Sequence, residues 1–344
     1  MERIKQIVFT KPNTAEFLDM GEVDFENLAP NRVIVKTYVS TLSAGTERAN
    51  ITGSDNISPG VEKATFPRYL GYSLSGVVVK VGSAVTKVVP GDRVVVYSTC
   101  QHKTYNTVKD EFVVKIEDDA VSFEDAAIAF IASFPLAAIR KVRLEIGESL
   151  LVMGLGILGQ IAVKLAKSAG AYPIIACDPI KERREEALKN GADYAFDPLE
   201  EGLREKVRAV TGKGVKTAIE VTGVGAGLDE TLDCMAKFGR VALLGCTRNS
   251  NFSIDFYQKV HCRGVTLIGA HTNARAELES SPSNFTHIDD IKVILNLSAK
   301  RNLALTDIIK EIHNPENSPA VYDRLVNDKS FPVGVQFDWR LIRE

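Results

Sequence analysis

The sequence predicts an α/β protein built around a doubly wound parallel sheet, joined to a β-rich part at the start of the chain. Three observations support this prediction. A short apolar run at 149–153 leads into a glycine-rich turn, and strand-like and helix-like segments then alternate up to about residue 270. Residues 1–122 are instead rich in Val, Ile and Thr, with glycine and proline at the breaks. Strands that alternate with helices are typical of parallel βαβ units.

The composition is that of an ordinary globular protein. At 344 residues the chain is long enough for two domains, and its formal net charge of −2 gives no electrostatic reason to expect nucleic acid or a membrane as a partner. No apolar run approaches the roughly 18 residues of a membrane helix, and the N-terminus lacks a signal-peptide core. Five scattered cysteines without a CxxC pair indicate reduced thiols. We therefore expect a cytoplasmic protein.

Residues 1–122 are expected to form short strands, at 6–9, 32–40, 74–81 and 93–96. A tight turn at Pro90, Gly91 and Asp92 precedes the last of them. Between Ser43 and Tyr69 the sequence is longer and less regular, and long irregular loops in compact domains are often functional.

From Ser122 onward the sequence favours helices and buried strands. An Ala-rich helix is expected to break at Pro135, where a second helical piece begins. After Asp178 we expect helices at 181–190, 199–211 and 227–237, alternating with strands at 218–222, 241–245 and 265–269. A last strand at 334–338 is expected to return to the first domain. The predicted domains are therefore 1–122 together with 274–344, and an inserted domain at 123–273.

The glycine-rich turn consists of Gly154, Leu155, Gly156, Ile157, Leu158 and Gly159. Between a strand and a helix this GxGxxG spacing is typical of dinucleotide binding. Its first glycine makes a tight turn, the second lets a pyrophosphate approach the backbone, and the third lets helix and strand pack closely. Unpaired amides at the start of the helix then face the phosphates. Asp178 lies 19 residues after Gly159, near the offset of about 20 at which an acid binds the ribose.

The charge of Asp178 favours NAD over NADP, because a carboxylate binds both ribose hydroxyls and repels the additional phosphate. Arg183, between Lys181 and Arg184, could hold that phosphate, although all three equally suit an exposed helix face. Thr222 and Gly245 lie at the ends of later strands, where ligands bind in open parallel sheets, or they are ordinary strand-end residues. We include Arg183, Thr222 and Gly245 among the candidate cofactor-binding residues.

These features resemble the medium-chain dehydrogenase/reductase superfamily, in particular its alcohol and polyol dehydrogenase branch. Besides the glycine turn, the resemblance rests on the segments AGTE at 44–47, LGYSLSGVV at 70–78, PGDRV at 90–94 and the Gly-Val pair at 334–335. It implies a GroES-like β-barrel catalytic domain, a Rossmann domain and a substrate cleft between them. It also implies a homodimer or homotetramer that acts on a small molecule.

The chain departs from this family at the metal site. Where zinc-dependent members carry Cys, His and Glu ligands, this sequence has Ala44, Tyr72 and Phe134. Catalytic zinc needs three protein ligands from Cys, His, Asp or Glu, and neither Ala nor Phe can bind a metal. The four-cysteine lobe that binds structural zinc in many relatives is also missing, with only Cys100 nearby. We therefore predict neither catalytic nor structural zinc.

Without a metal, a hydrogen-bond donor or general acid must serve the substrate oxygen. Thr46 matches the hydroxyl that relays the proton in relatives, although it could simply stabilise a turn. Tyr72 is either a proton donor or a buried core tyrosine. His102 matches a segment near the cleft of relatives and suits proton transfer, unless it is a surface histidine. Glu47 and Arg48 are expected to form a structural ion pair or to support the loop.

The first hypothesis is a zinc-independent oxidoreductase that transfers a hydride between NAD(H) and the hydroxyl or carbonyl carbon of a small alcohol, polyol or sugar-like substrate. A second is a quinone or enone reductase, which in this superfamily uses NADPH, so that Asp178 counts against it. A third is a nucleotide-binding sensor that kept the fold and lost the chemistry. The sequence leaves the substrate and the direction of reaction open.

Overall fold

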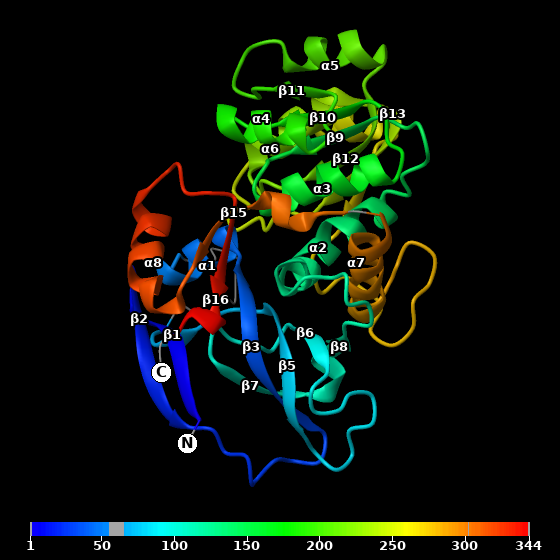
Figure 1. The fold of residues 1–344 in the computed structure, drawn as a ribbon. Helices are drawn as coiled ribbons and strands as arrows, with labels where there is room; N and C mark the ends of the chain where they lie inside the picture. The colour runs from blue at the N-terminus through cyan, green and yellow to red at the C-terminus, as the bar shows by residue number, and fades with distance from the viewer. Residues whose placement is uncertain (1, 55–64, 302, 343–344) are drawn as a thin grey trace. The chain divides into compact units, whose positions relative to one another are not determined.

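The computed structural model describes residues 2–54, 65–301 and 303–342. They form two compact units (Figure 1). Unit 1 contains the described residues up to Ile131 and those from Ile291 onward, whereas unit 2 runs from Ala132 to Asp290. These boundaries differ from the predicted ones after residues 122 and 273. The reason is that the helices α2 (Phe123–Lys141) and α7 (His287–Arg301) each continue across a boundary without a break.

Unit 1 is built on a seven-stranded sheet with the order β15-β16-β3-β5-β6-β8, in which β7 also pairs with β3. Its strands are β3 (Arg32–Leu42), β5 (Ser73–Val81), β6 (Arg93–Tyr97), β7 (Tyr105–Lys109), β8 (Val113–Lys115), β15 (Ile309–His313) and β16 (Gly334–Asp338). Figure 1 shows β16, in red, beside β3, in blue, and the two strands are antiparallel with Phe337 opposite Ser40. The predicted return of the last strand to the first domain is confirmed.

A second, three-stranded sheet of unit 1 has the order β2-β1-β4, with β1 (Arg3–Lys11), β2 (Thr14–Glu22) and β4 (Arg68–Tyr69). Its apolar side chains join a buried cluster that also takes Tyr322 from helix α8 (Ser318–Asn327), Phe337 and Trp339. Ile51, fully buried in the same cluster, holds the helix α1 (Ala44–Ile51) in place. Part of the segment expected to be irregular is therefore helical, whereas 55–64 lie outside the described residues.

Unit 2 is a six-stranded sheet with the order β11-β10-β9-β12-β13-β14, and all its pairs are parallel. The strands are β9 (Leu150–Met153), β10 (Ile174–Cys177), β11 (Tyr194–Phe196), β12 (Val215–Glu220), β13 (Met235–Leu243) and β14 (Thr266–Gly269). In chain order this is the 3-2-1-4-5-6 arrangement of a doubly wound dinucleotide-binding sheet. The connecting helices are α3 (Ile157–Ser168), α4 (Lys181–Lys189), α5 (Leu203–Thr211) and α6 (Gly225–Cys234).

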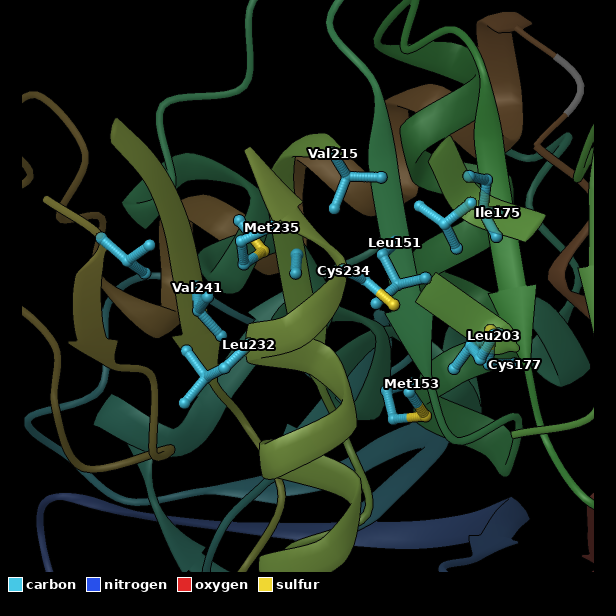
Figure 2. Packing of buried hydrophobic residues seen from close by; sticks show 13 residues of the cluster. Leu151, Met153, Ile175, Cys177, Leu203, Val215, Leu232, Cys234, Met235 and Val241 are labelled. Atoms are coloured by element: carbon cyan, nitrogen blue, oxygen red, sulfur yellow. The ribbon is translucent and has the colours of Figure 1, made fainter. Parts of the chain in front are cut away.

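One face of this sheet packs against α5 and α6 through an apolar cluster. Figure 2 shows how Leu151, Ile175 and Val241 of the strands lie with Leu203 of α5 and Leu232 of α6. Such burial stabilises the sheet by roughly 25 cal/mol for each Å² of apolar surface removed from water. The carboxyl ends of the strands, where the glycine turn begins, are thereby fixed.

Two predicted elements of this region are corrected. The helix α2 passes through Pro135 without ending, because the buried run from Ala126 to Ala132 holds the helix although a proline removes one amide donor. The helix predicted at 227–237 ends at Cys234, and Met235 already belongs to β13. Pairing of Met235 with Val215 across the sheet overrides the helical pattern there.

No helix in the described residues is long and apolar enough to cross a membrane. The five cysteines are unpaired, with Cys246 and Cys262 exposed and the other three buried.

Candidate functional site

A pocket of about 340 Å³ lies in unit 1. It is lined by Thr46, Glu47, Tyr69, Leu70, Gly71, Tyr72, Ser98, Thr99, Cys100 and Gln101. Three stretches of chain supply these residues, namely helix α1, the approach to strand β5, and the segment that follows β6. Most of the lining side chains carry a hydroxyl or amide, and none carries a positive charge. Such a wall suits an uncharged, hydroxyl-bearing molecule.

Two of the three predicted catalytic residues, Thr46 and Tyr72, face this pocket. The partly buried Tyr72 hydroxyl is hydrogen-bonded to the hydroxyls of Thr46 and Ser43. Burial raises the pKa of Tyr72 to about 12; the two hydroxyl partners lower it, and the nearby Glu47 carboxylate raises it again. The phenol therefore keeps its proton near neutral pH and can donate a hydrogen bond to a substrate oxygen.

The third predicted catalytic residue, His102, is not available to a substrate. Its side chain is only 1% exposed, and both ring nitrogens are engaged, Nδ1 with Ser40 Oγ at 2.8 Å and Nε2 with Glu47 Oε1 at 3.2 Å. The interpretation of His102 as a proton-transfer residue in the cleft is therefore corrected, and so is its alternative as a surface histidine. It is a buried histidine behind the pocket wall.

Gly71 explains how His102 comes so close to the pocket. Gly71 has φ +103°, and a Cβ atom at this position would lie 2.6 Å from the backbone nitrogen of His102 and 2.9 Å from its ring. The His102 amide donates to the carbonyl of Leu70 at 2.8 Å. A glycine is required here both for its backbone conformation and for this close packing. Tyr72, the next residue, is thereby held against the segment that carries His102.

Two of the three residues that we predicted at zinc-ligand positions, Ala44 and Phe134, have no atom in the side chain that could bind a metal. Ala44 starts helix α1, Tyr72 is a protonated phenol, and Phe134 of α2 makes a ring contact with His287 at 6.4 Å between centroids. Among the residues that the structure describes, no group of three His, Cys, Asp or Glu side chains is placed to bind a metal ion. The donor set available does not fit zinc.

The glycine turn of unit 2 has the geometry of a phosphate cradle. Gly154 has φ +96°, and a Cβ on Gly159 would lie 2.0 Å from the Gly154 carbonyl oxygen, so this glycine is needed for close packing. A Cβ on Gly156 would meet no atom within 4 Å, which leaves open space above the turn. Gly156 is the N-cap of α3, and no side chain caps the helix there. A ligand can therefore approach the amides at the helix N-terminus. The turn thus has room for a pyrophosphate.

Asp178 lies directly beside this turn at the end of β10. Its Oδ2 accepts a hydrogen bond from the Leu155 amide at 2.8 Å, and its Oδ1 accepts one from the Ile180 amide at 2.9 Å. Arg183 approaches the same carboxylate at 3.6 Å, whereas Arg184 is held by Asp197 and by backbone carbonyls. On α4, Arg183 thus approaches the Asp178 carboxylate, whereas Arg184 contacts the backbone carbonyl of Asp178.

Thr222 and Gly245 lie at the ends of β12 and β13, and the structure gives each a local role. The Thr222 hydroxyl and amide both donate to the buried carboxylate of Glu220, which also accepts from the Gly223 amide at 3.1 Å. A Cβ on Gly245 would lie 2.3 Å from the Gly223 nitrogen, so Gly245 allows two loops to pack together. Ile157 and Leu155 are buried, so they contribute backbone groups to the turn.

Sequence reasoning missed several residues behind the pocket. Glu47 was expected to support its loop or pair with Arg48, and it does support the loop, but its partners are His102 and Tyr322. Arg48 donates instead to the carbonyl of Leu325 at 2.8 Å. Tyr322 lies 275 residues from Glu47 along the chain, and no local pattern could have connected the two.

Comparison with known proteins agrees with this architecture. The family model for the alcohol dehydrogenase GroES-like domain matches residues 31–121, and the model for zinc-binding dehydrogenases matches residues 158–285. The chain is 29% identical over 305 residues to L-threonine 3-dehydrogenase of Pyrococcus abyssi, which covers 78% of this chain and 83% of that protein. It is 25% identical over 282 residues to D-guloside 3-dehydrogenase of Escherichia coli K12, covering 81% and 79%.

Among solved structures, the short chain alcohol dehydrogenase rspB of E. coli CFT073, complexed with the cofactor NADH, has a TM-score of 0.83 at 18% identity. The match covers 98% of this chain and 100% of that one. Fold and site thus define an oxidoreductase with a dinucleotide-binding unit and a GroES-like unit. The chain belongs to the medium-chain dehydrogenase/reductase superfamily, whose members are NAD(P)-dependent dehydrogenases. The predicted fold class and enzyme class are confirmed.

Proposed function

We propose that this enzyme transfers a hydride between NAD(H) and the hydroxyl or carbonyl carbon of a small alcohol, polyol or sugar-like substrate without zinc. The observation that carries the proposal is the hydrogen-bonded pair of hydroxyls, Thr46 and Tyr72, in the wall of the pocket. The lining, which contains the Glu47 carboxylate and no positive charge, supports a hydroxylated rather than an anionic substrate. The L-threonine, D-guloside and sorbitol dehydrogenases among the relatives act on hydroxyl-bearing compounds and support the same class.

The pocket residues would handle the substrate oxygen. Bound nicotinamide supplies the hydride acceptor or donor. As a carbonyl is reduced, negative charge develops on its oxygen, and the neutral Tyr72 phenol would stabilise this charge by donating a hydrogen bond and then a proton. Thr46, hydrogen-bonded to Tyr72, would pass a proton back to the phenol from solvent. In the oxidative direction the same two hydroxyls would carry the proton away.

The cofactor would lie on the glycine turn of unit 2. The open space above Gly156 would admit the pyrophosphate, and Asp178 would bind the ribose hydroxyls and disfavour the additional phosphate of NADP. The cofactor would also contact Arg183, Thr222 and Gly245, near the carboxyl ends of the strands of the same sheet. Zinc independence is supported by the side chains Ala44, Tyr72 and Phe134, of which two have no donor atom and the third keeps its proton.

The test combines metal analysis, cofactor binding and turnover. We expect purified enzyme to contain well under one zinc per chain, to bind NADH by fluorescence titration, and to reduce or oxidise members of an alcohol, polyol and ketose panel. The variant Tyr72→Phe should lower kcat about 100-fold with little change in NADH affinity, because it removes one proton donor. Tyr38→Phe is the matched control, since Tyr38 packs on Phe123 outside the pocket.

Other outcomes would contradict the proposal in distinct ways. Stoichiometric zinc would refute zinc independence, and full activity of Tyr72→Phe would remove the assigned proton donor. Turnover of quinones or enones with NADPH, but of no alcohol with NAD, would favour the reductase of conjugated substrates. Tight NADH binding without turnover across the panel would favour a sensor.

We also propose that the enzyme is a cytoplasmic homodimer or homotetramer. In the described residues β14 pairs with β13 alone and so ends the sheet of unit 2, and Phe252, Phe256 and Tyr257 are exposed in the same unit. An unprotected edge strand readily pairs with a second copy. Sedimentation velocity would show two or four times the mass of the chain. The unpaired cysteines support a reducing compartment.

A further inference from the structure

A buried hydrogen-bond network lies directly behind the pocket. The Glu47 carboxylate, 1% exposed, accepts from the Ser43 amide at 2.9 Å, from His102 Nε2 at 3.2 Å and from the Tyr322 hydroxyl. Because a carboxylate only accepts hydrogen bonds, His102 Nε2 carries a proton. On the other side of the ring, Nδ1 contacts Ser40 Oγ at 2.8 Å, and the same oxygen accepts from Trp339 Nε1 at 2.8 Å.

The network joins segments that are far apart in the chain. Ser40 belongs to β3, Glu47 to α1 and Tyr322 to α8, whereas Trp339 follows the last strand, β16. His102 comes from the segment 98–104, and the four residues immediately before it, 98–101, line the pocket wall. All these elements are part of unit 1. The network therefore ties the wall of the pocket to the C-terminal part of the same unit.

Burial of a carboxylate is a costly way to stabilise a protein. An apolar cluster of similar volume often gives the same or greater stability, so that a retained buried charge points to a role in fixing one arrangement. Here the surrounding cluster of Phe9, Leu42 and Phe337 already supplies apolar packing. Glu47 is flanked in helix α1 by Thr46, and its charge acts on Tyr72. What the network fixes is the proton-handling side of the pocket.

We propose that Glu47 is a positioning residue for the reaction. Held by His102 and Tyr322, its carboxylate fixes the first turn of α1, and with it the Ser43 and Thr46 hydroxyls to which Tyr72 is hydrogen-bonded. Glu47 borders the pocket, but its side chain is only 1% exposed and both of its carboxylate oxygens are bound by protein groups, so we assign it a positioning role and no contact with the reacting atoms. The proposal rests on the hydride-transfer function proposed above.

The decisive experiment is a double-mutant cycle on kcat. Glu47→Gln keeps the shape of the side chain but removes its charge, and we expect kcat to fall about 10- to 100-fold with NADH affinity unchanged, because small displacements of reacting groups have effects of this size. In the Tyr72→Phe background the same substitution should change kcat less than threefold, since the Tyr72 hydroxyl that Ser43 and Thr46 hold is already absent. A merely structural loss would be equally large in both backgrounds.

Two further variants guard against failure to fold. Tyr322→Phe keeps the ring packing against Phe9 and Phe337 and removes only the hydroxyl, so it repeats the cycle if Glu47→Gln does not fold. Glu311→Gln is the matched control, because Glu311 also binds a histidine, His313 at 2.7 Å, in unit 1 but away from the pocket. It should leave kcat unchanged.

Hydrogen exchange separates this inference from the proposed function. Amides of 44–51 should exchange faster in Glu47→Gln and in Tyr322→Phe than in wild type, and not in Glu311→Gln. Unchanged exchange there, or equal losses of kcat in the two backgrounds of an active enzyme, would overturn the positioning role and leave the hydride-transfer function intact. A wild-type enzyme with no turnover on any substrate would overturn the function and, with it, this inference.

Discussion

The proposed replacement of a metal ligand by Tyr72 would change how the enzyme treats a substrate oxygen. A metal ion stabilises an oxyanion by its charge, whereas Tyr72 can do so only by giving a hydrogen bond or a proton. Burial raises the pKa of Tyr72 to about 12, so the phenol is a poor base and a persistent donor at neutral pH. Its partnership with the Thr46 hydroxyl then matters, because a donor that has lost its proton must regain one before the next turnover.

At the same scale, Asp178 is the residue that we propose favours NAD over NADP. Replacement of Asp178 by Asn keeps an acceptor for the Leu155 amide but removes the negative charge. Arg183, which lies 3.6 Å from the Asp178 carboxylate, is then available to attract a phosphate. We expect the ratio of NADH to NADPH affinity to fall at least tenfold, which corresponds to about 1.4 kcal/mol. Fluorescence titration with both cofactors measures it.

The control for this prediction is Glu185→Gln, which removes the same charge from the exposed face of α4, where Glu185 pairs with Lys181. It should leave the ratio unchanged. A wild-type ratio in Asp178→Asn would mean that the carboxylate does not choose the cofactor.

Individual residues were predictable where a short motif contains all the information. Thr46 and Tyr72 lie in segments whose spacing resembles a known family, and both face the pocket. His102 was misjudged because its burial depends on Ser40, which lies 62 residues away along the chain, and on Trp339, which lies 299 residues from Ser40. A sequence shows that a histidine is present, but its hydrogen-bond partners are determined by tertiary packing.

At the scale of elements, the turn between β9 and α3 gives two glycines different tasks, which two variants can separate. Gly159→Ala places a methyl group 2.0 Å from the Gly154 carbonyl oxygen and should destabilise the protein by about 2–3 kcal/mol. In Gly156→Ala the new methyl group meets no atom within 4 Å, so the variant should unfold at the same urea concentration as wild type. It should bind NADH at least about tenfold more weakly, because the methyl group occupies the space that we assign to the phosphates.

Urea unfolding and NADH titration of both variants make this comparison. Each variant serves as the control for the other. Wild-type NADH affinity in Gly156→Ala would mean that no phosphate approaches the turn.

Elements were predicted well where apolar periodicity and burial agree, as in β9, α3 and β10. The helix predicted up to Lys237 was wrong at its end, because Met235 pairs with Val215 in the sheet, a contact that periodicity cannot reveal. The expected break at Pro135 was also wrong. A proline inside a helix costs roughly 3 kcal/mol through a lost hydrogen bond and a steric clash, and burial of the apolar side of a long helix offsets this cost.

For the whole molecule, the alternation of strands and helices was sufficient to predict a parallel sheet, since parallel neighbours need crossover connections. The return of β16 to β3 followed from the expectation that a discontinuous domain closes on itself, and the pairing of Phe337 with Ser40 confirms it. The unit boundaries were not predictable, because α2 and α7 continue across them. A change from strand-like to helix-like patterns in the sequence marks where the type of element changes. The boundary between two compact units can lie elsewhere.

Stability of the whole chain should depend on pH through His287. Burial and the nearby Arg275 lower the pKa of His287 to about 4, against about 6.5 in an unfolded chain. The unfolded state therefore binds more protons between these values, so stability falls as pH drops from about 6.5 to about 4. After allowance for partial exposure, we expect His287 to account for about 2 kcal/mol of that loss.

Urea unfolding at pH 7 and pH 5 measures this contribution when wild type is compared with His287→Gln. Carboxylates such as Glu220, whose pKa burial raises, also titrate in the acid range and change stability in both proteins alike. Only the difference between the two proteins reports on His287. We expect the variant to lose less stability than wild type on acidification, because glutamine takes up no proton when the chain unfolds. Equal losses in the two proteins would show that the ring is as easily protonated in the folded chain as in the unfolded one.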